Sequence, residues 1–158
     1  MEKIILAEPA VGIDIGSTTA KLVIIKNGDI VYRRYERHFS QVRQKTLELL
    51  RDAADFLKGE SFSAAISGSA GLGLARVADI PFVQEVFATS ETVKKLAPDT
   101  SSVIELGGED AKVIFFAGGT DERMNGTCAG GTGAFIDQMA TLLDVTVAEL
   151  DQLSLKHE

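Results

Sequence analysis

The chain contains one sequence pattern twice, and this internal repeat constrains the fold more than any other feature. The segment Val11–Ile24 aligns with Ser102–Phe115 at an offset of 91 residues. The alignment pairs Asp14 with Glu105, Gly16 with Gly107, Ala20 with Ala111, Lys21 with Lys112 and Gly28 with Gly119. A repeat of this kind indicates that one structural unit is built twice along the chain.

Each copy reads as an apolar strand that ends in an acid, a turn of small residues, and a second apolar strand. A third strand is predicted at Ile30–Arg37 in the first copy and at about residues 120–125 in the second. An amphipathic helix is predicted from Ser40, as its N-cap, to Leu57. The remaining predictions for the first copy are a strand at Phe62–Ser67, a helix at Gly71–Val77, a strand at Pro81–Val83 and a helix at Thr89–Leu96.

The second copy repeats only the beginning of the first. A helical pattern starts near Gly131, and a capping box at Thr146–Glu149 opens one more helix. The period of the repeat would carry the second unit to about residue 190. We therefore expect an α/β fold with one complete lobe at residues 1–98 and a truncated second lobe at residues 99–158.

The composition is that of an ordinary globular protein and narrows the range of partners. Of the 158 residues, 45% are hydrophobic and 25% are charged, and the net charge is −7. No basic run is present, so nucleic acid is not expected as a partner. No signal peptide and no apolar stretch of about 20 residues is found, so no membrane association is expected. The single cysteine, Cys128, excludes an internal disulfide and favours a cytoplasmic location.

The first turn carries groups that suit a phosphate. Gly16 allows a tight turn, and successive N–H groups with the hydroxyls of Ser17, Thr18 and Thr19 form a concave surface of donors. Asp14 ends the preceding strand, where it can hold Mg²⁺ through water, and Lys21 can neutralise phosphate charge. A plain hairpin with polar turn residues explains this single motif equally well.

The second turn favours the phosphate interpretation, because the same chemistry occurs twice. Glu105, Gly107 and Gly108 repeat the acid and the glycine turn, and Lys112 repeats the lysine. Glu109 or Asp110 is a candidate for orienting an attacking water. We predict that the two turns grip the phosphates of one nucleotide from both sides.

A cysteine lies in a glycine-rich segment, Asn125–Phe135, that leads directly into a helix. The N–H groups and the dipole at a helix N-terminus stabilise anions and lower the pKa of a thiol. An iron–sulfur cluster is bulky and anionic and accepts N–H hydrogen bonds at its sulfurs. The residues alone leave two other interpretations of Cys128 open, a buried inert cysteine and a third phosphate loop.

The two turns resemble the phosphate motifs of the actin, sugar-kinase and heat-shock-chaperone ATPase superfamily. Gly12–Thr19 is similar to the first motif and Glu105–Gly108 to the second, with Glu105 in place of the usual aspartate. The resemblance implies the actin-like (ribonuclease H-like) fold and a Mg-ATP cleft between two lobes. The glycine-rich adenosine motif of the superfamily comes late in the second lobe, and no segment of this chain matches it.

The cysteine segment narrows the resemblance further. From Val11 to about Leu153 the chain resembles the ATP-dependent activases of 2-hydroxyacyl-CoA dehydratases and benzoyl-CoA reductases. This implies a homodimer that shares one [4Fe–4S] cluster, with Cys128 as the first of two cysteines from each subunit. It also implies one-electron transfer, driven by ATP hydrolysis, to an acyl-CoA dehydratase or reductase. The second cysteine is not among these residues, so we expect the 158-residue chain alone to be inactive and without its cluster.

Two other functions stay open at this stage. An actin-like kinase for a sugar or an acyl group would need an aspartate as catalytic base, and none is identified. A nucleotide-sensing module would work by lobe closure without chemistry. His38 and His157 have no metal-ligand spacing and are predicted to be surface residues. Gly68, Gly71 and Gly73 are predicted to serve tight packing between a helix and a strand.

Overall fold

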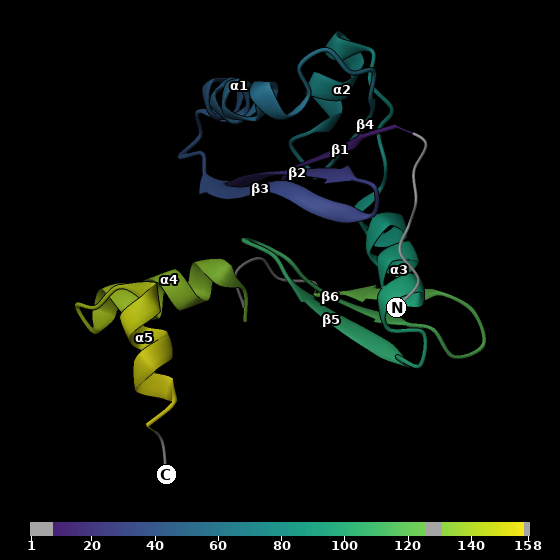
Figure 1. Cartoon of the computed structure of the whole chain (residues 1–158). Helices are drawn as coiled ribbons and strands as arrows, with labels where there is room; N and C mark the ends of the chain where they lie inside the picture. Colours follow the sequence, from purple (N-terminus) through teal and green to yellow (C-terminus); the bar gives the residue numbers. More distant parts are fainter. Residues whose placement is uncertain (1–7, 126–130, 157–158) are drawn as a thin grey trace. The chain divides into compact units, whose positions relative to one another are not determined.

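The computed structural model describes residues 8–125 and 131–156, which fold into two compact units. The first unit ends at Thr100 and the second begins at Ser101. Both units combine a sheet with helices (Figure 1), as the α/β prediction requires. No helix in the described ranges is both long and apolar enough to cross a membrane.

A four-stranded sheet forms the centre of the first unit. Its strands are β1 (Ala10–Ile15), β2 (Thr19–Lys26), β3 (Asp29–Arg37) and β4 (Ser63–Ser67), in the order β3-β2-β1-β4. Strands β1, β2 and β3 pair antiparallel, and β4 lies parallel to β1. The carboxyl ends of β1 and β4 therefore lie at the same edge of the sheet, next to the β1–β2 turn.

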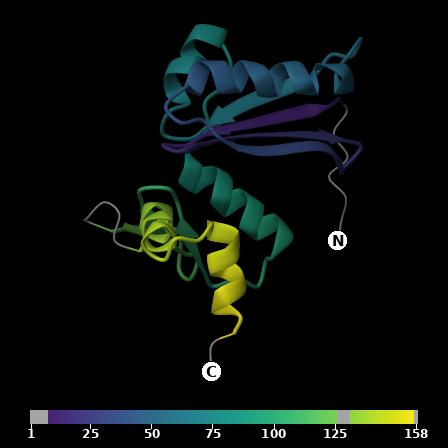
Figure 2. The ribbon, with the colours of Figure 1, turned by 90° about the vertical axis from the view of Figure 1, so that its left-hand side faces the viewer.

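Helices lie on both sides of this sheet. Helix α1 (Val42–Ala53) continues into a short 3-10 helix, η1 (Ala54–Phe56), and α2 (Leu72–Ala78) follows β4. Helix α1 covers one face of the sheet, and α3 (Glu85–Leu96) lies on the opposite side (Figures 1 and 2). The first unit thus has the layered form that buries both sheet faces.

Alternating apolar residues build the core between the sheet and α1. Because side chains in a strand alternate between faces, every second residue of β1 and β2 turns toward α1. Helix α1 contributes Thr46, Leu49 and Ala53 to the same layer. The buried apolar residues of this core are Val11, Ile13, Ile15, Ala20, Leu22, Ile24, Leu49, Ala53, Ile66 and Ala75.

The second unit contains a smaller sheet followed by two helices. Strands β5 (Ser102–Leu106), β6 (Ala111–Phe115) and β7 (Asp121–Met124) form an antiparallel sheet in the order β5-β6-β7. Helices α4 (Gly133–Leu142) and α5 (Val147–Ser154) follow. The capping box predicted for α5 is confirmed: Thr146 and Glu149 bond to each other's backbone N–H.

The repeat is confirmed at the level of strand register. Asp14 lies opposite Lys21 in the β1–β2 pair, and Glu105 lies opposite Lys112 in the β5–β6 pair. Helix α4 begins 91 residues after the start of α1, which is the same offset. Within the described residues, β1 has a parallel neighbour, whereas β5 pairs only with β6. The first unit therefore has the full set of repeated elements and the second has its first part.

Several elements differ from the predictions, and three of these differences have a clear local description. Helix α1 starts after Gln41, because Ser40 has a positive φ of 64° and an N-cap needs an extended backbone. The strand predicted at Pro81–Val83 is reduced to a single bridge between Phe82 and Ile66. Helix α3 begins at Glu85, four residues earlier than predicted, after Gln84 in an extended conformation.

Candidate functional site

The first turn, Gly16–Thr18, joins β1 to β2. The N–H of Gly16 donates to the carbonyl of Thr19 at 2.9 Å and closes the turn. Ser17 and Thr18 are partly exposed, whereas Thr19 begins β2 and is buried. Ser17 and Thr18 are therefore the hydroxyls of this turn that solvent and a ligand can reach directly.

An aspartate and a lysine form an ion pair beside the first turn. Lys21 Nζ lies 2.7 Å from Asp14 Oδ2, as the strand register dictates, and 5.3 Å from the centre of the Tyr35 ring. Both charged side chains remain partly exposed. They also border an open groove within the first unit, lined by residues of β1, β2, β3 and β4 and by Ala88 and Thr92 of α3. The pair thus offers a carboxylate for a hydrated metal and a cation for a phosphate.

Gly68 directly follows β4 and lies in close contact with the end of β1, next to Asp14. A Cβ atom on Gly68 would lie 2.2 Å from the carbonyl oxygen of Ile15 and 2.6 Å from Asp14 Oδ1. Its φ of +95° also favours glycine. The turn after Gly68 is held by a hydrogen bond, in which the N–H of Ala70 donates to the carbonyl of Ile15 at 2.9 Å. Gly68 is tightly packed, but against the end of β1 at Ile15 and Asp14 rather than between a helix and a strand. The predicted packing is confirmed for Gly71, where a Cβ would lie 2.4 Å from the Ser67 carbonyl oxygen, and is wrong for Gly73, where a Cβ would meet nothing within 4 Å.

The prediction for His38 is wrong, because this residue is 4% exposed and contacts the first turn. Its ring Nε2 lies 3.0 Å from the carbonyl oxygen of Gly16, and its backbone N–H donates to Thr18 at 3.2 Å. His38 directly follows β3, whose last residue, Arg37, pairs with Thr19, and this pairing brings the histidine next to the first turn. His157 lies outside the described residues.

The second turn, Gly107–Glu109, repeats the first in its backbone and its charges. The N–H of Gly107 donates to the carbonyl of Asp110 at 2.8 Å, which reproduces the Gly16–Thr19 bond. Lys112 Nζ lies 3.5 Å from Glu105 Oε1. Lys112 is only 7% exposed, whereas Glu109 is exposed and Asp110 is partly exposed. The two turns therefore present the same acid–lysine pair, with the second lysine buried more deeply.

Helix α4 begins directly on the second turn. The N–H groups of Gly133 and Ala134 donate to the carbonyls of Gly107 and Gly108, both at 2.9 Å. The contact is close, since a Cβ on Gly133 would lie 3.2 Å from the Gly107 oxygen. Cys128 lies outside the described residues, in the segment 126–130 that joins β7 to α4. The helix that follows the cysteine segment thus rests on the second turn.

The described part of the chain contains no group of three or more His, Cys, Asp or Glu residues that could hold a metal ion by themselves. A magnesium ion bound through water and phosphate needs only one or two carboxylates, and each turn has one beside it, Asp14 at the first turn and Glu105 at the second. A [4Fe–4S] cluster needs four thiolates, and the chain has one cysteine. The donors present therefore fit Mg-ATP but do not by themselves complete an iron–sulfur cluster.

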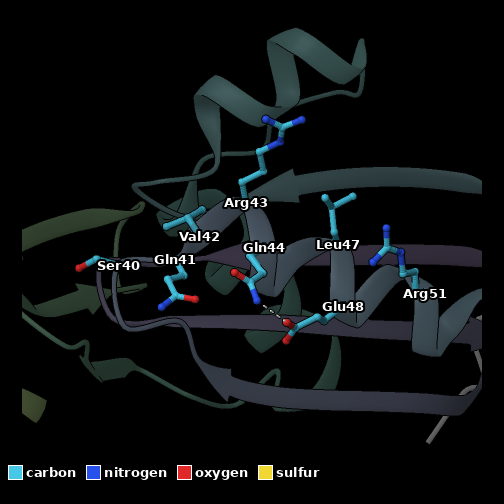
Figure 3. A pocket seen from close by; sticks show the side chains of 8 residues that line it. All are labelled: Ser40, Gln41, Val42, Arg43, Gln44, Leu47, Glu48 and Arg51. Atoms are coloured by element: carbon cyan, nitrogen blue, oxygen red, sulfur yellow. Dashed lines mark hydrogen bonds between the residues drawn. The ribbon is translucent and has the colours of Figure 1, made fainter.

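A second hollow lies on the outer face of α1, and its lining includes neither Asp14 nor any residue of the first turn. Figure 3 shows its lining, in which Gln44 and Glu48 are joined by a hydrogen bond of 3.1 Å. All eight lining residues are exposed or half-buried: Ser40, Gln41, Val42, Arg43, Gln44, Leu47, Glu48 and Arg51. This hollow lacks the buried polar groups that fix a ligand in place, and we assign it no role.

Residues 11–158 match the BadF/BadG/BcrA/BcrD ATPase family, so the similarity extends over nearly the whole chain. The chain belongs to this family. The repeated turns described above lie within the matched range, as does the cysteine segment.

Three curated relatives of the chain are named as activators of acyl-CoA dehydratases. The chain is 32% identical over 151 residues to the (R)-2-hydroxyglutaryl-CoA dehydratase activating ATPase of Acidaminococcus fermentans, covering 92% of this chain and 57% of that protein. It is 33% identical over 149 residues to the activator of lactoyl-CoA dehydratase of Anaerotignum propionicum, covering 90% and 56%. The chain thus spans little more than half the length of these relatives.

Solved structures confirm the actin-like fold. The activator of the 2-hydroxyisocaproyl-CoA dehydratase from Clostridium difficile, solved with bound ADPNP, has a TM-score of 0.78 and 31% identity, covering 95% of this chain and 57% of its own. The ethanolamine utilization protein EutJ from Carboxydothermus hydrogenoformans has a TM-score of 0.62 at 17% identity, covering 94% and 61%, which indicates the shared fold alone. The family and fold class expected from the sequence are both confirmed.

Proposed function

We propose that the protein containing this chain hydrolyses Mg-ATP and activates a 2-hydroxyacyl-CoA dehydratase or a related benzoyl-CoA reductase by transferring one electron. The observation that carries the proposal is the repeated acid–glycine–lysine turn, with the helix after the cysteine segment bonded to the second copy. The relatives named as dehydratase activators supply the class of partner.

The first turn contributes phosphate and metal contacts. N–H groups of the turn and the hydroxyls of Ser17 and Thr18 donate to phosphate oxygens, because such concave backbone segments bind anions. Asp14 holds Mg²⁺ through water, and Lys21, already placed 2.7 Å from that carboxylate, balances the charge of the arriving phosphate. Thr19 supports the turn from its buried position at the start of β2.

The second turn contributes the groups for hydrolysis. Gly107 and Gly108 provide the backbone for a phosphate contact, and Lys112 neutralises charge beside it. Glu105 is the acid beside this turn, and Glu109 or Asp110 orients the attacking water. Lys112 is suited to this role because its buried ammonium, 3.5 Å from Glu105, is held in one place.

Cys128 provides one thiolate ligand of a [4Fe–4S] cluster in the native protein. The cluster supplies one-electron redox chemistry when it is bound. Because the 158 residues contain one cysteine, the other ligands come from a second subunit and from residues beyond this chain. We therefore propose a homodimer, with the cluster at the subunit interface.

Helix α4 connects nucleotide chemistry to the cysteine segment. Its first two N–H groups are bonded to the carbonyls of Gly107 and Gly108, so a change in the shape of the second turn displaces the start of the helix. The segment that contains Cys128 ends at this point. ATP binding and hydrolysis at the turn would in this way move the residues next to the cysteine.

The test uses the native protein purified without oxygen. We expect it to contain iron and sulfide and to hydrolyse ATP in the presence of Mg²⁺. Asp14→Ala should abolish hydrolysis and leave the iron content unchanged, because Asp14 lies in β1 beside the first turn and not in the cysteine segment. Asp52→Ala, which removes an exposed acid on α1, is the matched control and should hydrolyse ATP normally. An iron-free protein that phosphorylates a sugar or an acyl group, or that binds ATP without hydrolysis, would contradict the proposal.

A further inference from the structure

We propose that His38 is a positioning residue that holds the first turn in the shape that receives a phosphate. The inference rests on the proposed nucleotide function of this turn and names a residue that acts on it. His38 lies between β3 and α1, is 4% exposed, and makes hydrogen bonds to two of the residues of the turn.

The hydrogen bonds of the imidazole determine its tautomer. The N–H of Ser40 points at Nδ1 at 3.2 Å, and a backbone N–H can only donate. Nδ1 is therefore the acceptor, and the ring proton of the neutral histidine is on Nε2. Nε2–H then donates to the carbonyl of Gly16 at 3.0 Å. The ring thus connects the turn after β3 to the turn after β1 with both nitrogens satisfied.

The hydrogen bond that fixes the orientation of the Gly16 carbonyl also fixes the direction of the next backbone donor, the N–H of Ser17. In a trans peptide the C=O and the following N–H point in opposite directions. With the Gly16 carbonyl turned toward His38, the N–H of Ser17 must point away from it. The backbone N–H of His38 holds the carbonyl of Thr18 at 3.2 Å in the same manner. His38 therefore faces the carbonyl side of the turn and leaves the N–H of Ser17 free to face an anion.

The short turn that follows His38 is strained and tightly tied. Phe39 and Ser40 are consecutive non-glycine residues with positive φ values of 46° and 64°. Such a conformation persists only where neighbouring contacts determine it. Burial of Phe39 does not compensate, since this side chain is 77% exposed. The bonds from Ser40 to the ring and from Gln41 N–H to the His38 carbonyl at 2.7 Å hold this turn instead.

In the second unit a backbone N–H donates to the turn carbonyl that matches the acceptor of the His38 ring. There, the carbonyl of Gly107 accepts from the N–H of Gly133, at the start of α4. The repeat places Gly133 at the position of Val42, the first residue of α1. Glycine permits the close approach of the helix to the turn, whereas Val42 carries a branched side chain. In the first unit the donor to the matching carbonyl, that of Gly16, is the His38 ring.

Two substitutions of His38 test the two hydrogen bonds of its ring one at a time. Asn at position 38 places an acceptor near the Nδ1 position for Ser40 but does not reach Gly16, whereas Gln can place an amide donor near the Nε2 position. In the native protein we expect His38→Asn to raise the KM for ATP about tenfold, the effect of one lost hydrogen bond, with a smaller change in kcat. His38→Gln should restore most of the affinity. Thr46→Val is the control, because it removes a buried hydroxyl bonded to Val42 at 2.8 Å without touching the turn.

Amide hydrogen exchange of Ser17 and Thr18 without nucleotide provides a second measurement. His38→Asn should accelerate this exchange, and His38→Gln and Thr46→Val should not. The inference is overturned if both His38 variants match the wild type in KM and exchange, or if Thr46→Val raises the KM as much as His38→Asn. If the wild-type protein fails to bind ATP, the proposed function falls, and the exchange data alone then decide whether His38 holds the turn.

Discussion

Each of the two turns has a neighbouring glycine whose missing side chain lets a second segment touch it. Gly68 brings the end of β4 against Asp14 and Ile15, and Gly133 brings the start of α4 against Gly107. In both cases a Cβ atom would meet backbone, which cannot rotate away as a flexible side chain can. These glycines therefore control how closely the supporting segments approach the acid and the turn.

Gly68→Ala tests this control in the first unit. The new Cβ would overlap the carbonyl of Ile15 and occupy a positive φ, so we expect the free energy of unfolding to fall by about 2–4 kcal/mol. Gly73→Ala is the matched control: it lies in α2 with nothing within 4 Å of its Cβ position, and it should stabilise by up to about 1 kcal/mol. Denaturant unfolding measures both. Equal stability of the two variants would mean that the β4 end moves away from Asp14 easily.

The acid–lysine pairs could be predicted from the sequence, but the role of His38 could not. Alternating apolar residues fix the strand register, and the register brings Asp14 to Lys21 and Glu105 to Lys112. His38 follows the end of β3, where the alternation stops and a turn with positive φ begins. Sequence patterns carry no information about the direction of a side chain in such a turn.

The two turns differ in their contact with the helix of the same unit, α1 in the first unit and α4 in the second. Helix α4 donates two of its free N–H groups to the second turn, which satisfies donors that every helix leaves open. Helix α1 is displaced by the Phe39–Ser40 turn, and the side chain of its N-cap, Gln41, makes no capping hydrogen bond. The helix start predicted at Ser40 was wrong for this reason, whereas the capping box of α5 was predicted from its sequence pattern alone.

Gly133→Ala tests the contact between α4 and the second turn. The Cβ would lie 3.2 Å from the Gly107 oxygen, so the helix must shift by a few tenths of an ångström and lengthen its two bonds. We expect ATP hydrolysis by the native protein to fall about fivefold, which corresponds to about 1 kcal/mol. Gln138→Ala, an exposed position in the same helix, should hydrolyse ATP normally. Normal hydrolysis by Gly133→Ala would show that the contact does not influence the turn.

The capping box of α5 predicts a pH dependence. The backbone N–H of Thr146, and then its hydroxyl, hold the pKa of Glu149 below its ordinary value of 4.5. A carboxylate with a lowered pKa in the folded state stabilises above the unfolded pKa, and this contribution is lost as the pH falls through the folded pKa. We therefore expect the start of α5 to fray below about pH 4.5, as followed by NMR. Glu149→Gln should remove this pH dependence; if the dependence persists, another group is responsible.

At the scale of the whole molecule, the repeat is the feature that the sequence predicts best. It gives the two units, their strand order and the equivalence of their turns, because each copy needs the same alternation of apolar residues to bury one sheet face. The described residues of the second unit include no parallel neighbour for β5, whereas β4 serves β1 in the first. The chain spans 57% of the length of the Acidaminococcus fermentans relative, and the ligands needed to complete the proposed cluster are not among its residues.

Cys128→Ser in the native protein tests whether the nucleotide and the cluster occupy separate parts of the sequence repeat. Cys128 follows β7 and precedes α4, so it belongs to neither turn. We expect the variant to lose its iron and its ability to activate the partner enzyme, while its affinity for ATP stays unchanged because the groups of both turns are intact. Iron analysis and calorimetric titration with ATP measure the two properties, and Thr127→Ala is the control from the same segment. If the variant loses ATP binding together with iron, Cys128 belongs to the nucleotide site. If it retains iron, the cluster assignment is wrong and the cysteine segment serves the second turn alone.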